Sequence, residues 1–128
     1  MHITLETDYA IRIVDLLVKN INQPHLDAKS ISERTGVSHR YALKILRKLV
    51  AGEIVKSRRG ALGGYELLKK PQNISLYDVV EIMEGEYKFS RCLEENYNCT
   101  SNCKCGYQVV FAEISAEVCK KLKKHKFG

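Results

Sequence analysis

Four of the five cysteines of this chain gather in one short stretch, at Cys92, Cys99, Cys103 and Cys105, with gaps of six, three and one residue. Cysteines that serve only as small apolar core residues are scattered singly. These four stand instead among polar residues, several of them asparagines. Such a cluster indicates a metal site, a disulfide or a redox function.

The cellular compartment decides among these alternatives. The N-terminal residues lack a basic start followed by an apolar stretch, so we expect no secretory signal. No apolar run approaches the roughly 20 residues that a membrane span needs. We therefore expect a cytoplasmic protein without a membrane segment, in which thiols stay reduced. A structural disulfide is then disfavoured, and a metal or redox site is favoured.

Positive charge is concentrated in one third of the chain. The formal net charge is +6, from 21 Lys and Arg against 15 Asp and Glu. Residues 38–70 alone carry nine basic and two acidic residues, a net charge of +7. A polyanion such as nucleic acid is the natural partner of this segment. A solvated basic face would have the same composition, so charge alone leaves both interpretations open.

Apolar spacing predicts a helix from Thr4 to about Ile21, followed by two short helices that Gly36 and Val37 separate. Asp27 is the expected N-cap of the first short helix and Ser38 that of the second, which ends at Gly52. The predicted buried stripe of this helix consists of Ala42, Ile45, Leu46 and Leu49. Two short helices around a glycine-containing turn, the second one basic, predict a helix-turn-helix.

In a helix-turn-helix the early residues of the second helix enter the major groove. The predicted base-contacting residues are Ser38, His39, Arg40, Tyr41 and Lys44. Arg47 and Lys48 lie deeper and are expected at phosphates. Two simpler interpretations stay open: Tyr41 packs against the preceding helix, and Arg47 and Lys48 are merely solvated.

A hairpin is predicted next, from a strand over 53–57, a glycine-rich tip and a strand over 65–68. A hairpin after a helix-turn-helix is a wing. Arg58, Arg59 and Gly60 at its tip are expected to reach phosphates or a narrow minor groove. A nucleotide-binding phosphate loop is disfavoured, because no Gly-Lys-Ser or Gly-Lys-Thr follows the glycines.

Two more helices are expected. Ser75 caps the first, with Asp78 as its capping-box partner, and Gly85 ends it. The second runs from Tyr107 to about Lys124, with an apolar seam and, after it, a basic tail that we expect to fray. Because no further helix is available to cover the seam within the chain, we expect a partner subunit there.

The predicted fold is mainly α with a small β-hairpin: a winged helix-turn-helix with a long C-terminal dimerisation helix. Its expected parts are a DNA-binding domain over 1–85, a cysteine-rich cluster-binding loop over 86–106, and the dimerisation helix with its basic tail over 107–128. The cysteine loop would thus connect the part that reads DNA to the part that pairs two subunits.

Four local sequences support a family resemblance: T-D-Y-A at 7–10, I-S-E-R-T-G-V-S at 31–38, R-G-A-L-G-G-Y at 59–65 and I-S-L-Y-D-V-V at 74–80. With the cysteine loop after them, the chain resembles the bacterial winged-helix regulators that include IscR, NsrR and CymR, the Rrf-two family. The resemblance implies a homodimeric transcriptional regulator, not an enzyme. It also implies binding to a partly palindromic double-stranded operator.

In family members with a cysteine loop, the resemblance further implies an iron–sulfur cluster, and we favour 2Fe-2S over 4Fe-4S. The usual gaps of about five residues between ligands match Cys92, Cys99 and Cys105 best, which leaves Cys103 additional. No histidine follows the third cysteine closely, as it does in IscR-like proteins. NsrR-like proteins use a carboxylate of the other subunit instead, and Asp8 is at the matching position. Asp8 and Cys103 are equal candidates for the fourth ligand.

The expected function is therefore a repressor whose operator affinity depends on the cluster, which senses nitric oxide, redox state or iron–sulfur status. One alternative is a zinc-containing regulator, since Cys99, Cys103 and Cys105 are close enough for a tetrahedral site. Another is a thiol switch whose cysteines oxidise directly. A catalytic cysteine is disfavoured, because the four histidines lie in terminal, loop or DNA-facing positions.

Overall fold

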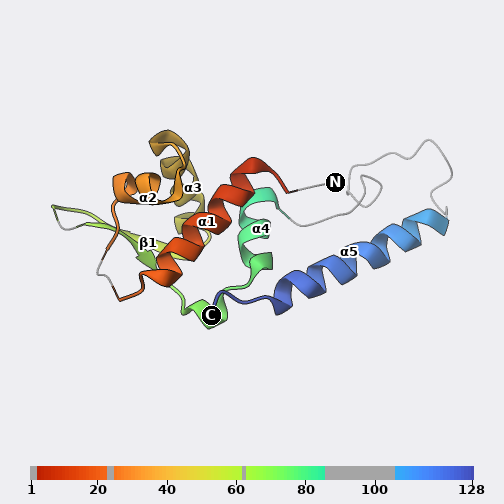
Figure 1. Ribbon diagram of the computed structural model, residues 1–128. Helices are drawn as coiled ribbons and strands as arrows, with labels where there is room; N and C mark the ends of the chain where they lie inside the picture. The colour runs from red at the N-terminus through yellow and green to blue at the C-terminus, as the bar shows by residue number, and fades with distance from the viewer. Residues whose placement is uncertain (1–2, 23–24, 62, 86–105) are drawn as a thin grey trace.

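The computed structural model describes residues 3–22, 25–61, 63–85 and 106–128 (Figure 1). The elements are α1 (Leu5–Lys19), α2 (Ala28–Thr35), α3 (His39–Ala51), β1 (Val55–Arg58), β2 (Gly64–Leu67), a 3-10 turn (Pro71–Asn73), α4 (Leu76–Glu84) and α5 (Gly106–Lys124). The two strands form one antiparallel hairpin. This arrangement confirms the predicted fold class.

Side chains cap the helices where the sequence predicts them. The Asp27 carboxylate accepts a hydrogen bond from the Ser30 backbone N at 2.7 Å, and α2 ends at Gly36 in the left-handed conformation, with φ of 77°. Ser75 and Asp78 form the predicted capping box, each side chain accepting from the other's backbone N at 3.2 and 2.9 Å. These local contacts satisfy backbone groups that the helix ends leave without partners.

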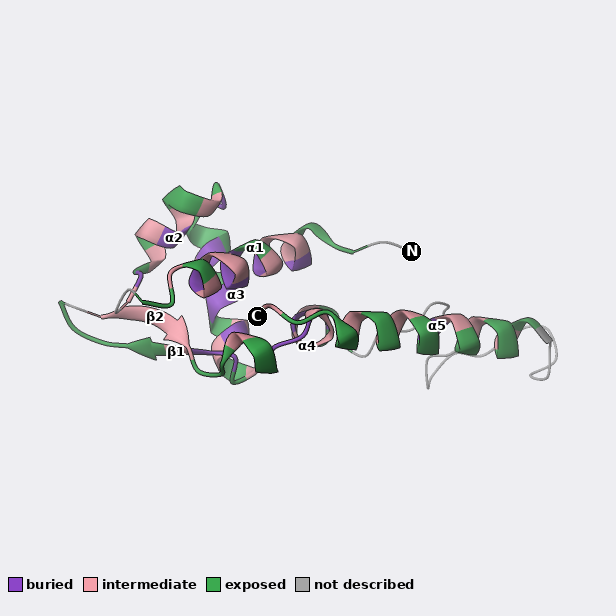
Figure 2. Ribbon diagram, turned by 60° about the horizontal axis from the view of Figure 1, so that its bottom comes forward, coloured by how far each residue is buried: buried purple, intermediate pink, exposed green. Residues whose placement is uncertain are grey.

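One apolar core lies between α1, α2, α3 and α4, and the buried residues face it in Figure 2. The predicted stripe of α3 is confirmed, because Ala42, Ile45, Leu46 and Leu49 are all fully buried. From α1, the buried residues are Thr7, Ala10, Ile13, Val14 and Leu17. The helix predicted to run to about Ile21 is shorter than expected. α1 ends at Lys19, and Ile21 lies in the following turn with 52% of its surface exposed.

The strands of the wing lie closer to its tip than predicted, over 55–58 and 64–67 instead of 53–57 and 65–68. The first strand begins at Val55 rather than Glu53, because Glu53 has a φ of 62° in the turn that follows α3. Val55 pairs with Leu67, and Arg58 pairs with Gly64. The segment before α2 also contacts the wing, where the Tyr65 backbone N donates to the Leu26 carbonyl at 2.8 Å. The hairpin is thus attached to the helical core along one strand.

The predicted fraying of the C-terminal tail is wrong. The Leu76 backbone N donates to the His125 carbonyl at 2.9 Å, and the Phe127 backbone N donates to the Ile74 carbonyl at 3.0 Å. The expectation that α5 finds no helix within the chain is also wrong. The Lys123 ammonium lies 4.6 Å from the centre of the Tyr77 ring of α4.

The other end of α5 projects from the body of the protein (Figure 1). Tyr107 is 73% exposed there, and Val109 and Val110 are exposed beside it. Of the helices that the structure describes, none combines the length and the apolar character that crossing a membrane requires. Tyr107, Val109 and Val110 thus leave apolar surface exposed on the projecting part of α5.

We predict that Ile45→Ala lowers the free energy of unfolding by about 2–5 kcal/mol, because Ile45 is fully buried and its loss leaves a cavity. Arg47→Ala, on the exposed side of the same helix, is the control and should change this free energy by less than about 0.5 kcal/mol. Urea denaturation followed by circular dichroism measures both. Equal stability of Ile45→Ala and the wild type would contradict the orientation of α3.

Candidate nucleic-acid interface

The side of α3 that faces away from the core is basic and open. A hollow of about 840 Å³ lies along it, and its described lining consists of His39, Arg40, Tyr41, Leu43, Lys44 and Arg47. Arg40, Lys44 and Arg47 are exposed, and Lys48 is half-buried. Within the part of the chain that the structure describes, Arg40 and Arg47 form no ion pair. Their guanidinium groups are free to bind an anion.

The first turn of α3 combines capping, packing and exposure. The Ser38 hydroxyl accepts a hydrogen bond from the Tyr41 backbone N at 3.3 Å, so it serves as the N-cap. The Tyr41 ring meets Tyr9 edge-to-face, with ring centres 6.3 Å apart. This packing partner lies on α1 rather than on α2, and 46% of Tyr41 stays exposed. His39 and Arg40 are exposed beside it, so this turn can present side chains to a groove.

Glu6, at the start of α1, binds two of the predicted DNA-contacting lysines. The Lys44 Nζ lies 2.7 Å from Glu6 Oε1, and the Lys48 Nζ lies 3.4 Å from Glu6 Oε2. The hydrogen bond from Lys44 lowers the pKa of Glu6, and the same bond raises the pKa of Lys44. Both groups are therefore charged at neutral pH, and the two lysines are partly neutralised.

Glu6 was not among the predicted site residues, although the spacing of charged residues in α1 distinguishes it from the other acidic residues of this helix. Asp8 pairs with Arg12, four positions on, at 3.0 Å. Asp15 likewise pairs with Lys19 at 2.7 Å. The residue four positions after Glu6 is an alanine, so this carboxylate has no cation at that spacing within its own helix. An acidic residue without such a partner is a candidate for pairing with another element.

In the wing, one carboxylate lies close to three basic side chains. Glu66 lies 3.1 Å from the Lys56 Nζ, 3.5 Å from the Arg58 Nε and 3.3 Å from the His25 Nδ1. The hydrogen bond from Lys56, helped by the nearby charge of Arg58, lowers the pKa of Glu66. The His25 Nδ1 is buried, and its approach to Glu66 lacks the geometry of a hydrogen bond. Arg58 is thus engaged by its own hairpin.

The wing tip presents Arg59 without such a partner. Gly60 has a φ of 107°, a conformation that favours glycine, and its carbonyl accepts from the Gly63 backbone N at 3.0 Å. Arg59 is exposed and forms no ion pair with any residue in the described ranges. Of the two predicted tip arginines, Arg59 is therefore the one without an ion pair to a described residue.

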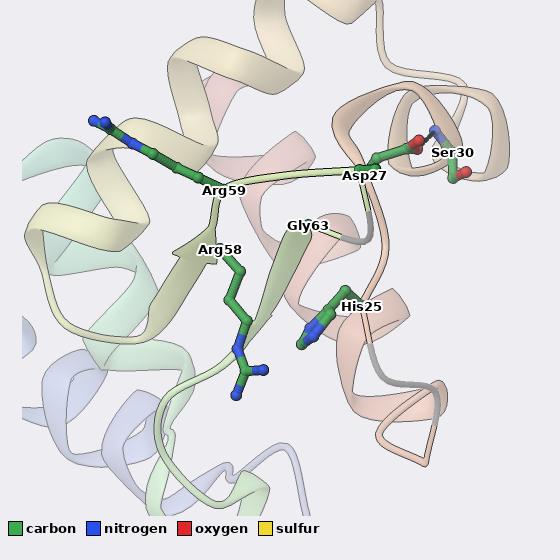
Figure 3. A pocket seen from close by; sticks show the side chains of 7 residues that line it. His25, Asp27, Ser30, Arg58, Arg59 and Gly63 are labelled. Carbon is green, nitrogen blue, oxygen red and sulfur yellow. Dashed lines mark hydrogen bonds between the residues drawn. The ribbon is translucent and has the colours of Figure 1, made fainter.

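A hollow of about 560 Å³ separates the wing from the start of α2. Its described lining is His25, Asp27, Ser30, Arg58, Arg59, Ala61 and Gly63. Figure 3 shows Arg58 and Arg59 pointing to different sides, with Asp27 turned toward Ser30. Because the two guanidinium groups diverge and a carboxylate lies opposite them, this hollow does not form a focused anion site.

The predicted cysteine ligands, Cys92, Cys99, Cys103 and Cys105, lie outside the described residues. Asp8 is described: it lies in the first two turns of α1, about half exposed, with Arg12 as its ion-pair partner. Over the described ranges, no three His, Cys, Asp or Glu side chains come together as a metal site would need. Cys119, the one described cysteine, is half-buried in α5.

Comparison with known proteins gives a consistent result. Residues 3–128 match the model of the Rrf2 family, described as an iron-dependent transcriptional regulator. The chain is 31% identical over 123 residues to protein rrf2 of Nitratidesulfovibrio vulgaris, covering 95% of this chain and 81% of that protein. It is 28% identical to the HTH-type transcriptional regulator NsrR of Bacillus subtilis, covering 88% and 78%.

Among solved structures, the fold is similar to that of CymR, the global cysteine regulator of Bacillus subtilis. The TM-score is 0.82 at 23% identity, and the match covers 99% of this chain and 93% of CymR. This likeness extends to the winged helix and the C-terminal helix, and it shows a shared fold.

We predict that Glu66→Gln lowers the free energy of unfolding at neutral pH by up to about 1 kcal/mol, because three basic groups lose a partly exposed carboxylate. The pKa of Glu66 is lowered by folding from 4.5, so its contribution is present above pH 4.5 and is lost as the pH falls through the lowered value.

Urea denaturation of the variant and the wild type at several pH values measures this difference, which should vanish in acid. Glu33→Gln is the control, since Glu33 is exposed on α2 without an ion pair to any described residue. A stability difference for Glu66→Gln that persists unchanged below the lowered pKa would contradict the role of this charge.

Proposed function

Because this chain belongs to the Rrf2 family of transcriptional regulators, we propose that it is a repressor whose operator affinity is controlled by an iron–sulfur cluster. Its signal is nitric oxide, redox state or the iron–sulfur status of the cell. As a regulator of chromosomal DNA it acts in the cytoplasm. The observation that carries its DNA-binding role is a set of exposed arginines on α3 and at the wing tip that form no ion pair with any described residue: Arg40, Arg47 and Arg59.

In the proposed complex, the first turn of α3 enters the major groove. Base edges are contacted by Ser38, His39, Arg40, Tyr41 and Lys44. Arg47 and Lys48, deeper along the helix, bind phosphates, and the wing residues Arg58, Arg59 and Gly60 bind the backbone or the minor groove. Arg40 is the strongest candidate for reading a guanine, because its unpaired guanidinium can donate two parallel hydrogen bonds to the O6 and N7 acceptors.

The operator is proposed to be partly palindromic and the protein a homodimer. The exposed apolar residues Tyr107, Val109 and Val110 support this proposal, since covering apolar surface with a partner lowers the free energy. Two copies of α3 then need a separation of about 34 Å, or a multiple of it, to enter successive major grooves. Any change that alters this separation alters operator affinity.

The donor set suits an iron–sulfur cluster. Cys92, Cys99 and Cys105 supply thiolates at the spacing expected for ligands, and the family's description as iron-dependent supports iron as the metal. When bound, such a cluster supplies a centre that reacts with electrons, oxygen or nitric oxide. Asp8 of the other subunit is one candidate for the fourth position, because among the described residues its half-exposed carboxylate has an ion pair with Arg12 alone. Cys103 is the alternative fourth ligand.

A second proposal keeps the fold and replaces the cluster with a thiol switch or a zinc ion. The fourth cysteine in the loop, Cys103, favours it, since two nearby thiols can form a reversible disulfide and a set of thiols can bind zinc. Metal and sulfide analysis of protein purified without oxygen separates these proposals. Iron with inorganic sulfide supports the cluster, whereas zinc, or no metal, supports the alternative.

We predict that Arg59→Ala raises the dissociation constant for operator DNA about 5- to 10-fold and reduces the slope of log affinity against log salt by about 1, because one phosphate contact is lost. Visible cluster absorption should stay unchanged. Lys121→Ala, which removes an exposed positive charge from α5, is the matched control. Equal loss in both variants would show that overall charge, rather than the wing tip, drives binding.

We predict that Cys92→Ala abolishes the visible absorption of anaerobically purified protein and alters its operator affinity, whereas Cys119→Ala leaves both unchanged. Asp8→Ala and Cys103→Ala then identify the fourth ligand, since only the true ligand's removal should destabilise the cluster toward air. Absorption spectra and fluorescence-anisotropy titrations measure these effects. A Cys92→Ala protein that keeps its absorption and responds normally to oxidants would overturn the sensing proposal.

A further inference from the structure

Glu6 links two elements that are far apart in sequence. It lies in the first turn of α1, and it binds Lys44 and Lys48 on the side of α3 that faces away from the core. The two lysines are four residues apart and therefore share one side of the helix. The carboxylate accepts from both ammonium groups, at 2.7 and 3.4 Å, so one anion occupies the place between two cations. A DNA phosphate would occupy such a place in a complex.

These contacts are exposed enough for exchange with a ligand. The exposed fractions of the side chains are 54% for Lys44, 39% for Lys48 and 30% for Glu6. Ion pairs of this exposure are screened by water and salt and contribute little to stability. A polyanion can therefore replace Glu6 as the ion-pair partner of the two lysines while the protein stays folded.

Other contacts keep Glu6 in place when the lysines leave. The Thr4 hydroxyl caps α1 by accepting from the Thr7 backbone N at 3.3 Å. Three residues after Glu6, Tyr9 packs edge-to-face against Tyr41 of α3. The start of α1 is thus attached to α3 by ring packing as well as by charge. Glu6 stays beside the DNA-facing side of α3 and repels phosphates there.

We propose that Glu6 competes within the molecule for Lys44 and Lys48, both of which bind phosphates when the protein lies on non-operator DNA, and that it lowers the affinity of the protein for duplex DNA. This inference rests on the proposed DNA-binding function and deepens it. Non-specific affinity comes almost entirely from cations that replace condensed counterions on the phosphates. Arg40 and Arg47 form no ion pair with Glu6. Glu6 therefore lowers the non-specific affinity for DNA and leaves these two arginines available.

The test measures binding of wild type and Glu6→Gln to a random-sequence DNA duplex over a range of salt concentrations. Glu6→Gln should bind about 5- to 10-fold more tightly, and its slope of log affinity against log salt should be steeper by about 1 to 2, as expected for one or two added phosphate contacts. Asp15→Asn removes the same charge from α1 but releases only Lys19. It should behave as the wild type does.

The same substitution in a Lys44→Ala, Lys48→Ala background separates competition from loosened packing. In that background Glu6→Gln has no lysines to release, so it should change the slope of log affinity against log salt very little. If the substitution acted by loosening the packing instead, it would change DNA affinity equally in both backgrounds. Unchanged or weaker binding by Glu6→Gln, with wild type binding normally, overturns this inference alone. Wild-type protein that binds no duplex DNA even at low salt overturns the proposed function and the inference with it.

Discussion

Burial of the apolar side of α3 is the constraint on which the rest of the interface depends. Ile45, Leu46 and Leu49 are fully buried, and burial of each such side chain contributes about 1.5–3 kcal/mol. Exposed ion pairs contribute less, so packing rather than charge sets the rotation of α3 about its axis. With 3.6 residues per turn, this rotation leaves Arg40 and Arg47 facing solvent. The basic side of α3 faces solvent because the apolar side must be buried in the core.

Two glutamates then divide the exposed cations into engaged and free groups. On α3, Glu6 engages Lys44 and Lys48, and in the wing Glu66 engages Lys56 and Arg58. On α3 and in the wing, the exposed arginines without an ion pair among described residues are Arg40, Arg47 and Arg59. Net charge therefore overstates the positive charge that is available to a polyanion. The free guanidinium groups have the planar geometry that suits phosphates and guanine.

α1 connects the two proposed activities of the chain. Glu6 and Tyr9 of this helix contact α3, while Asp8 pairs with Arg12 within the helix. Asp8, one of the two candidates for the fourth cluster ligand, is thus only one to two residues from the contacts to the DNA-facing helix. At the other end of the molecule, the chain terminus packs against α4 through hydrogen bonds to Ile74 and Leu76, which orients the projecting α5. The helices that flank the cysteine segment are consequently both attached to the core.

Local chemistry made much of this fold predictable from sequence, including the caps at Asp27, Ser38 and Ser75 and the buried stripe of α3. These features depend on neighbours within one or two helical turns, so residue type and spacing suffice. The family motifs likewise lie in short local sequences. Only the tertiary structure brought Glu6 to Lys44, His25 to Glu66, and the chain end to α4, because those partners are distant in sequence and meet through packing. The same packing decided which cations of a plainly basic segment stay free for DNA.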